Sequence, residues 1–219
     1  MVTSISGSQY RLHNEAKCET MGTLWRILEV NNSAQRIFGE VTGFSLLLTI
    51  LHSFQSGGDS YECPIEDRIK VFKYLMRVVT AGVCDNAVNR MKLHTVILSQ
   101  TFNDLLSESG LICVEFERQV IQLLLELCLE MVLPPYMNLE DAQSSSSMES
   151  NSSSFHLITP SGSFHPNKER VYNAGAIRIL IRLLLLFTPK VQLEVLDIIE
   201  KLARAGPFNQ ENLTSVGLH

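Results

Sequence analysis

The sequence has no surplus of positive charge and no long apolar segment. Its 219 residues contain 18 lysines and arginines against 23 acidic residues, a formal net charge of -5. Nucleic-acid-binding proteins usually gather lysine and arginine into a basic face, so we expect no nucleic-acid partner. The most apolar run, Ile177 to Phe187, is short and contains Arg178 and Arg182, whereas a membrane span needs about 20 apolar residues. We therefore expect no direct membrane insertion.

Signals for secretion and disulfide formation are also missing. The first 20 residues contain no apolar signal-peptide region. The five cysteines are an odd number and lie within apparent helices, which is typical of buried thiols in a reducing compartment. These features predict a cytoplasmic or nuclear location.

Motifs for catalysis and metal binding are absent as well. No G-x-S-x-G elbow, phosphate-binding loop or dinucleotide fingerprint occurs. Glu115, Glu117, Glu126 and Glu130 share one helix with Gln and Arg at helical spacing, which favours a solvated face over acid/base chemistry. We therefore expect no catalytic, cofactor-binding or metal-binding residue, no enzyme activity and no small-molecule substrate. The histidines show no metal-ligand spacing: His13, His52, His94, His156, His165 and His219.

What the sequence does contain favours helices packed by aliphatic side chains. Hydrophobic residues make up 45% of the chain but aromatic residues only 7%, which indicates an all-α fold rather than a β-sandwich. Pro64 opens a predicted helix that runs to Ala81, with one polar stripe and an otherwise apolar circumference. A helix apolar on more than one face is typical of the interior of a helical solenoid. The stripe consists of Glu66, Lys70, Lys73 and Arg77.

The same pattern recurs further along the chain. Shorter helices are predicted from Gly22 to Val30 and on either side of Thr42-Gly43 between Ala34 and Phe54, and a longer one from Cys113 to Leu133. The last of these has Glu115, Arg118, Gln122, Glu126 and Glu130 on its predicted solvent side. Another helix begins at Thr188-Pro189 and ends at Gly206.

An internal repeat joins the two halves. A shift of 206 - 82 = 124 places VFKYLMRVVTAG, which ends at Gly82, on VLDIIEKLARAG, which ends at Gly206, and superimposes their polar stripes. In the second copy Gly175 and Gly217 lie 217 - 175 = 42 residues apart, and armadillo and HEAT repeats have periods of roughly 40 to 47. Any leucine-rich bundle shows some self-similarity, but the coincidence of stripe and terminator favours an armadillo/HEAT-like α-solenoid.

Four segments follow from these patterns. We expect a flexible N-terminus over residues 1-21, armadillo-like helical repeats over 22-139, a disordered Ser-rich insertion over 140-168, and a truncated helical repeat over 169-219. Thr159-Pro160 in the insertion is a possible site for a proline-directed kinase. Because a further repeat would begin near Gly217, we expect the last helices to leave an apolar flank uncovered.

Two segments carry a family resemblance. VNNSAQRIFGEVTGFSLLLTILHSFQ (30-55) and QLEVLDIIEKLARAGPFNQENLTSVG (192-217) resemble the long N-terminal armadillo-like region of BEACH-family proteins, and the resemblance covers most of residues 22-217. The family's FYVE finger, PH-BEACH module and WD propeller have no counterpart here, so the chain resembles a fragment or short isoform.

The resemblance implies a non-catalytic scaffold for selective autophagy of protein aggregates, associated with autophagosomes through its parent protein. Its expected partners are other proteins or the remaining repeats of the parent. The alternative is a helical-repeat adaptor that binds a small GTPase or a linear peptide in vesicle trafficking. The single tryptophan, Trp25, disfavours the ladder of Trp and Asn with which import-type armadillo proteins bind peptides.

Overall fold

The structure, a computed structural model, describes residues 3-41, 43-55, 64-133, 158-159, 162-163 and 169-218. Helices dominate these ranges, and the described part contains β structure only in the two-residue strands β1 (Ile158–Thr159) and β2 (Gly162–Ser163), which pair antiparallel. The helices are α1 (Thr3–Val30), α2 (Asn32–Val41), α3 (Ser45–Gln55), α4 (Ile65–Val83), α5 (Ala87–Ile97), α6 (Gln100–Glu108), α7 (Glu117–Leu129), α9 (Ala174–Leu183), the 3-10 turn η2 (Leu184–Leu186), α10 (Pro189–Arg204) and α11 (Pro207–Ser215).

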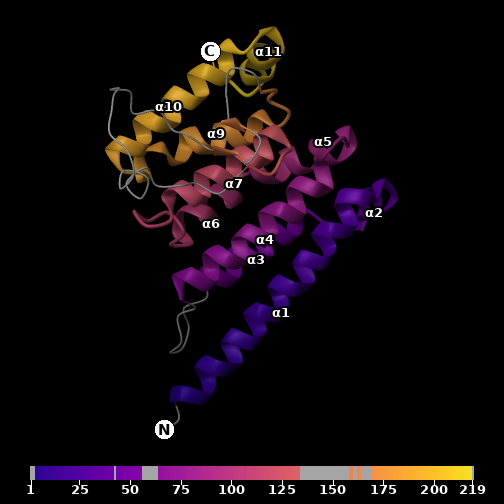
Figure 1. The fold of residues 1–219 in the computed structure, drawn as a ribbon, viewed down its shortest axis with the longest axis vertical. Helices are drawn as coiled ribbons and strands as arrows, with labels where there is room; N and C mark the ends of the chain where they lie inside the picture. Colours follow the sequence, from indigo (N-terminus) through magenta and orange to yellow (C-terminus); the bar gives the residue numbers. More distant parts are fainter. Residues whose placement is uncertain are drawn as a thin grey trace.

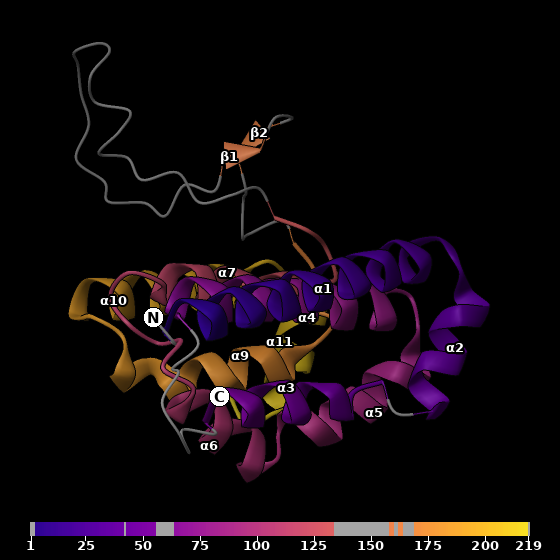
Figure 2. The same ribbon diagram turned by 90° about the horizontal axis from the view of Figure 1, so that it is seen from below.

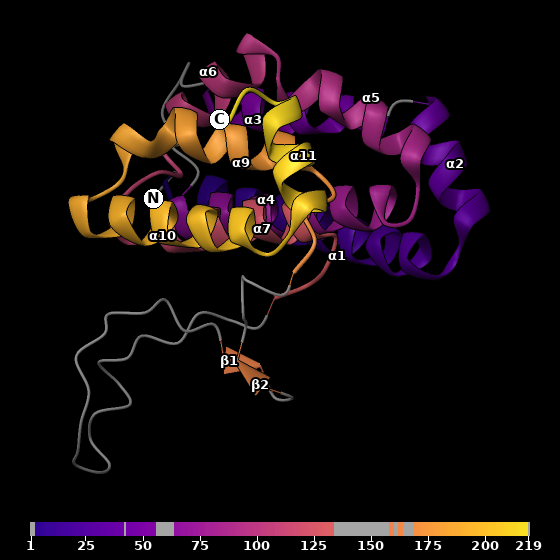
Figure 3. The same cartoon turned by 90° about the horizontal axis from the view of Figure 1, so that it is seen from above.

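The helices form two layers. Helices α1, α4, α7 and α10 lie side by side in one layer, and α3, α6 and α9 lie in the other (Figures 1 and 2). The shorter α2 and α5 pack on each other at one end of the molecule, and α11 crosses between the layers beside α10 (Figure 3). This stacking confirms the predicted all-α, solenoid-like fold.

Local sequence explains where several helices begin. The Asn86 side chain accepts the Asn89 N–H at 3.0 Å at the start of α5, and the Ser99 hydroxyl accepts the Phe102 N–H at 3.1 Å at the start of α6. Pro64 precedes α4 as its N-cap rather than as its first residue. The predicted break near Thr42-Gly43 is confirmed, since α2 ends and α3 begins around it.

The start of the first helix is a correction to the sequence prediction. We expected a flexible segment to residue 21 and a helix from Gly22, but α1 begins at Thr3. Asn14, Cys18 and Met21, spaced four and three residues apart, are buried, and α1 packs along α4. A buried stripe this narrow gives only a weak periodic signal, because the rest of the helix is polar.

Two further boundaries differ. The helix predicted over Cys113 to Leu133 spans only Glu117–Leu129, and Glu130 caps it in the left-handed region with φ 53°. Ala81 and Gly82 lie inside α4, whereas Gly206 lies beyond the end of α10 with φ 150°. The two dipeptides are therefore not equivalent terminators, although α4 and α10 begin at positions that correspond under the 124-residue shift.

The predicted loop over residues 55-62 and the predicted Ser-rich insertion fall almost wholly outside the described residues; only Gln55 and the strands β1 and β2 are described. In the described ranges no single helix is long and apolar enough to cross a membrane; the pair α2 and α3, bent by 60°, passes on length and composition alone. Leu47, Ile50 and Leu51 of α3 are buried in the protein core.

Candidate functional site at the ends of the long helices

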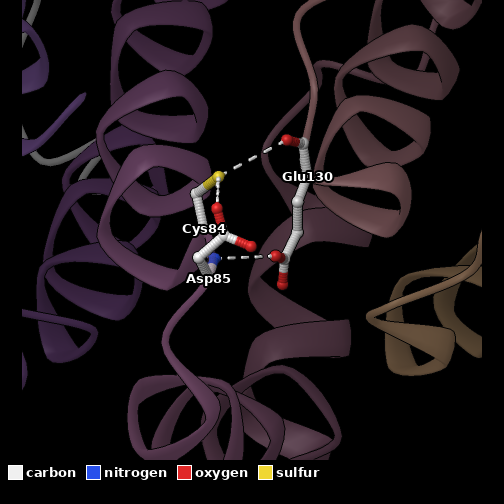
Figure 4. A group of neighbouring side chains, drawn as sticks. All are labelled: Cys84, Asp85 and Glu130. Atoms are coloured by element: carbon white, nitrogen blue, oxygen red, sulfur yellow. Dashed lines mark hydrogen bonds between the residues drawn. The ribbon is translucent and has the colours of Figure 1, made fainter. Parts of the chain in front are cut away.

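Two sharp turns bring a thiol and two carboxylates together (Figure 4). Cys84 and Asp85 follow the end of α4, and Glu130 ends α7; Asp85 and Glu130 both have positive φ, 54° and 53°. Glu130 Oε2 accepts the Asp85 N–H at 3.2 Å, and the Cys84 thiol donates to the Glu130 carbonyl at 3.8 Å. The ligand atoms of the three side chains lie within 4.8 Å of one another, which is the geometry of a candidate metal site.

The surroundings of this cluster do not suit a metal ion. Arg90 donates from Nε to Oε1 of Glu130 and from Nη2 to Oε2 at 2.6 Å, and Asn173 Nδ2 donates to Oε1 at 2.9 Å. A cation would have to displace this guanidinium fork. Burial, then the charges of Asp85 and Glu130, raise the pKa of the Cys84 thiol, whereas metal binding needs the thiolate. As arranged, the cluster joins the α4–α5 turn to the end of α7.

A buried side-chain amide closes each junction between a long helix and the helix that follows. Nε2 of Gln35 donates to the Leu28 carbonyl at the end of α1, and Nδ2 of Asn89 donates to the Gly82 carbonyl at the end of α4, at 3.0 and 2.7 Å. The carbonyls of a helix's last turn have no partner within the helix, so these amides act as caps supplied by the next element. In both cases the donor follows its acceptor by seven residues.

The same arrangement occurs in the second half. Asn209 in α11 donates to the Leu202 carbonyl of α10 at 2.8 Å, again seven residues earlier. Asn173 caps Leu127 of α7 at 3.0 Å from across the Ser-rich insertion. The second bond of Gln35, Asn89 and Asn209 joins another segment; Asn89, for example, also donates to the Gln35 carbonyl at 2.8 Å. These four amides are therefore a structural signature of the repeat.

Glu117 and Glu130 correct the prediction that the acidic residues of this helix form a solvated face. The Glu117 carboxylate accepts the backbone N–H and the hydroxyl of Thr188 at 2.8 and 2.7 Å, and so caps the N-terminus of α10 from α7. Only 3% of the Glu130 side chain is exposed. The prediction failed because these positions face neighbouring helices, which helical spacing alone cannot reveal. Glu115 is exposed, as predicted.

Glu126 is the third buried carboxylate, with an exposed fraction of 2%. Its Oε1 accepts Gln122 Nε2 at 3.0 Å and the Leu133 N–H at 3.1 Å. Desolvation raises its pKa above the ordinary value, although these hydrogen bonds and the charge of Arg77 act in the opposite direction. Glu126 therefore holds the chain that leaves α7, and it was also predicted, wrongly, to be on the solvent side.

A groove runs over α4 and α7 beside Glu126. It has a volume of about 550 Å³, and its walls include Lys73, Arg77, Gln119 and Glu126. A second hollow, of about 340 Å³, shares Arg77 and Glu126 and extends the lining to Trp25 on α1. The Arg77 guanidinium lies 4.8 Å from the Trp25 ring centroid, a cation–π contact. The groove lining combines cationic, acidic, amide and apolar groups.

The remaining predicted residues do not form a site. His13, His52 and His94 are each exposed, and no histidine joins a metal-like cluster in the part of the chain that the structure describes. The other three histidines lie outside the described residues. Thr159 belongs to β1, and its phosphorylation stays a prediction.

The fold and its junctions are those of a helical-repeat protein, and two relatives show which family it resembles in sequence. The chain is 64% identical over 218 residues to Protein SPIRRIG of Arabidopsis thaliana, and 59% identical over 221 residues to BEACH domain-containing protein A2 of the same plant. Each match covers 99% of this chain but only 6% of the relative. The chain is thus homologous to a small segment of BEACH-type proteins, which supports the resemblance noted in the sequence. No family model and no solved structure matches it.

Proposed function

We propose that the chain is a non-catalytic scaffold segment of a BEACH-family protein and serves selective autophagy of protein aggregates. The observation that carries the proposal is the similarity to BEACH domain-containing protein A2 over 99% of the chain. It is supported by the use of buried polar groups: Glu117, Glu130 and the junction amides bond to neighbouring helices. In such a segment the buried polar side chains serve to hold neighbouring helices in position through hydrogen bonds.

The finer assignment is to scaffolds like Alfy, the autophagy-linked BEACH protein with WD repeats and an FYVE domain, whose N-terminal armadillo-like region the sequence resembles. In this proposal the segment works in the cytoplasm or the nucleus and reaches autophagosomes through its parent protein. Its partners are proteins or the other repeats of the parent, without nucleic acid, membrane insertion or small-molecule substrate.

Proximity labelling tests this assignment. Residues 1-219 are fused to a labelling enzyme in cells that accumulate ubiquitin-positive aggregates, and the same fusion without residues 140-168 is the comparison. We expect enrichment of aggregate and autophagy proteins over the enzyme alone. A label set without autophagy proteins, from a soluble and folded fusion, contradicts the assignment.

A second candidate function, an adaptor for a linear peptide or a small GTPase in vesicle trafficking, is favoured by the groove over α4 and α7. Pull-down from cell extract with GDP or a GTP analogue tests it. Lys73→Glu reverses a charge in the groove wall, and Lys190→Glu makes the same change on α10, outside the groove. Loss of a nucleotide-dependent GTPase or of a bound peptide with the first variant alone supports the adaptor; equal recovery by both contradicts it.

A further inference from the structure

Helices α4 and α10 are two copies of one structural position. The 124-residue shift places Ile65, the first residue of α4, on Pro189, the first residue of α10. Both helices belong to the row α1, α4, α7, α10, but α4 lies inside the row and α10 lies at its end (Figure 1). The two helices can therefore be compared face by face.

One face agrees between the copies. Val71 and Val78 of α4 correspond to Val195 and Leu202 of α10, and all four are buried. In α4 this face turns towards α1, since Tyr74 lies between these residues and approaches Gly22 of α1. In α10 the corresponding side turns towards the body of the protein. There Arg118 of α7 donates two hydrogen bonds, of 3.2 and 2.9 Å, to the Glu194 carboxylate of α10.

The opposite face differs. Ile69 and Phe72 of α4 are 5% and 0% exposed, whereas their counterparts Leu193 and Leu196 of α10 are 70% and 43% exposed. Ile69 and Phe72 lie on the side of α4 away from Tyr74, and besides α1 the helix packs on α7, α2, α5 and α3. Leu193 and Leu196 of α10 are thus apolar like Ile69 and Phe72 of α4, but they are exposed where the residues of α4 are buried. Contiguous exposed apolar surface marks interaction sites, and Leu193 and Leu196 lie one helical turn apart on α10.

We propose that the Leu193–Leu196 face of α10 is a stacking surface for one long amphipathic helix, supplied by a further helical repeat of a longer polypeptide. The relatives are long enough to contain it, since the chain spans 6% of their length. The connection towards such a repeat is already formed: α11 follows α10 as α5 follows α4, and Asn209 caps α10 as Asn89 caps α4. The partner helix packs on α10 as each helix of the row α1, α4, α7, α10 packs on the one before it, and so extends the row by one helix.

The acidic residue on this face is paired within α10 itself. Glu200 of α10 takes the position of Met76, which is buried in α4. Glu200 is already paired within α10, with Nη2 of Arg204 at 2.5 Å, so the partner helix is specified by an aliphatic stripe for the two leucines. This inference rests on the proposed function in one respect, that the chain acts as a segment of a larger protein.

Thermal unfolding of an extended chain tests the surface. Residues 1-219 are extended by the segment of SPIRRIG, the 64% identical relative, that follows its matching region, in the wild type and in Leu193→Glu/Leu196→Glu. Val88→Glu/Met91→Glu is the matched control, because these two apolar residues of α5 are similarly exposed. We expect the extension to raise the Tm by about 4 °C in the wild type and the control, and by less than about 1 °C in the α10 variant.

An equal rise in all three chains, or none in any, overturns the proposal. Sedimentation of the unextended chain adds a second criterion: a dimer abolished by the α10 substitutions, with no effect of the extension, assigns the face to a second copy and also overturns it. These results are separate from proximity labelling, which can fail for lack of autophagy proteins while the extension still stabilises the chain.

Discussion

Replacement of Asn89 by alanine should strongly destabilise the protein, although the residue touches no proposed partner. Asn89 is 1% exposed, and its Nδ2 donates to the carbonyls of Gln35 and Gly82 at 2.8 and 2.7 Å. The Gly82 carbonyl belongs to the last turn of α4, where no backbone donor of the helix reaches it. Asn89→Ala therefore leaves a buried acceptor unpaired and a gap between α2, α4 and α5.

The size of the effect follows from the two lost bonds. A buried polar group without a partner costs about 1–3 kcal/mol, and the second bond contributes about 1 kcal/mol. We expect the free energy of unfolding to fall by about 3 kcal/mol. With a urea m-value of roughly 2–3 kcal/mol/M, the unfolding midpoint should fall by about 1–1.5 M.

Urea unfolding followed by circular dichroism measures this shift. Asn32→Ala is the control: it makes the same substitution at an exposed position in α2, and should change the free energy of unfolding by less than about 0.5 kcal/mol. If Asn89→Ala unfolds at the same urea concentration as this control, the amide does not hold the repeats together and the reasoning is refuted.

Three further substitutions test other parts of the structure in the same assay. Glu130→Gln should cost roughly 2 kcal/mol, less than for a fully buried pair because Arg90 is partly exposed; no change would mean that the fork is not formed in solution. For Glu126→Gln the effect depends on pH. Because the pKa of Glu126 is raised in the folded state, the folded protein binds this proton more tightly than the unfolded chain does. The stability contributed by the protonated carboxyl is therefore lost as pH rises above the ordinary value of 4.5 and through the raised pKa. The wild type should therefore lose stability relative to the variant towards neutral pH, and parallel pH profiles would contradict the burial of this carboxyl. Gly39→Ala places a Cβ 1.9 Å from Asn89 Oδ1 and should cost about 1–3 kcal/mol; a wild-type midpoint would show that α2 and α5 are not in close contact.

Periodicity predicted the helices whose apolar faces are wide. Helix α4 was found within two residues of its ends because it is buried on both sides of a clear polar stripe. By contrast, α5 and α6 were not recognised in the sequence, although Asn86 and Ser99 cap them in the ordinary way. Exposed Val88 and Met91 interrupt the amphipathic pattern of α5, so its burial depends on neighbours that the sequence does not identify.

The junction residues were missed for a different physical reason. Gln35, Asn89, Asn173 and Asn209 are polar, and a polar residue near the start of a helix is usually assigned to the surface. Their burial follows from the carbonyls that the preceding long helix leaves unpaired. The seven-residue spacing from helix end to amide was available in the sequence for three of them, but it becomes a signal only when the helix ends are known.

Side-chain amide hydrogen exchange, measured by NMR, tests the central claim most directly. If buried amides join successive repeats, the NH₂ groups of Gln35, Asn89, Asn173 and Asn209 should exchange at least about 100-fold more slowly than that of exposed Asn32, because exchange then requires opening of the junction. Exchange of these four groups at the rate of the exposed asparagine would contradict the account.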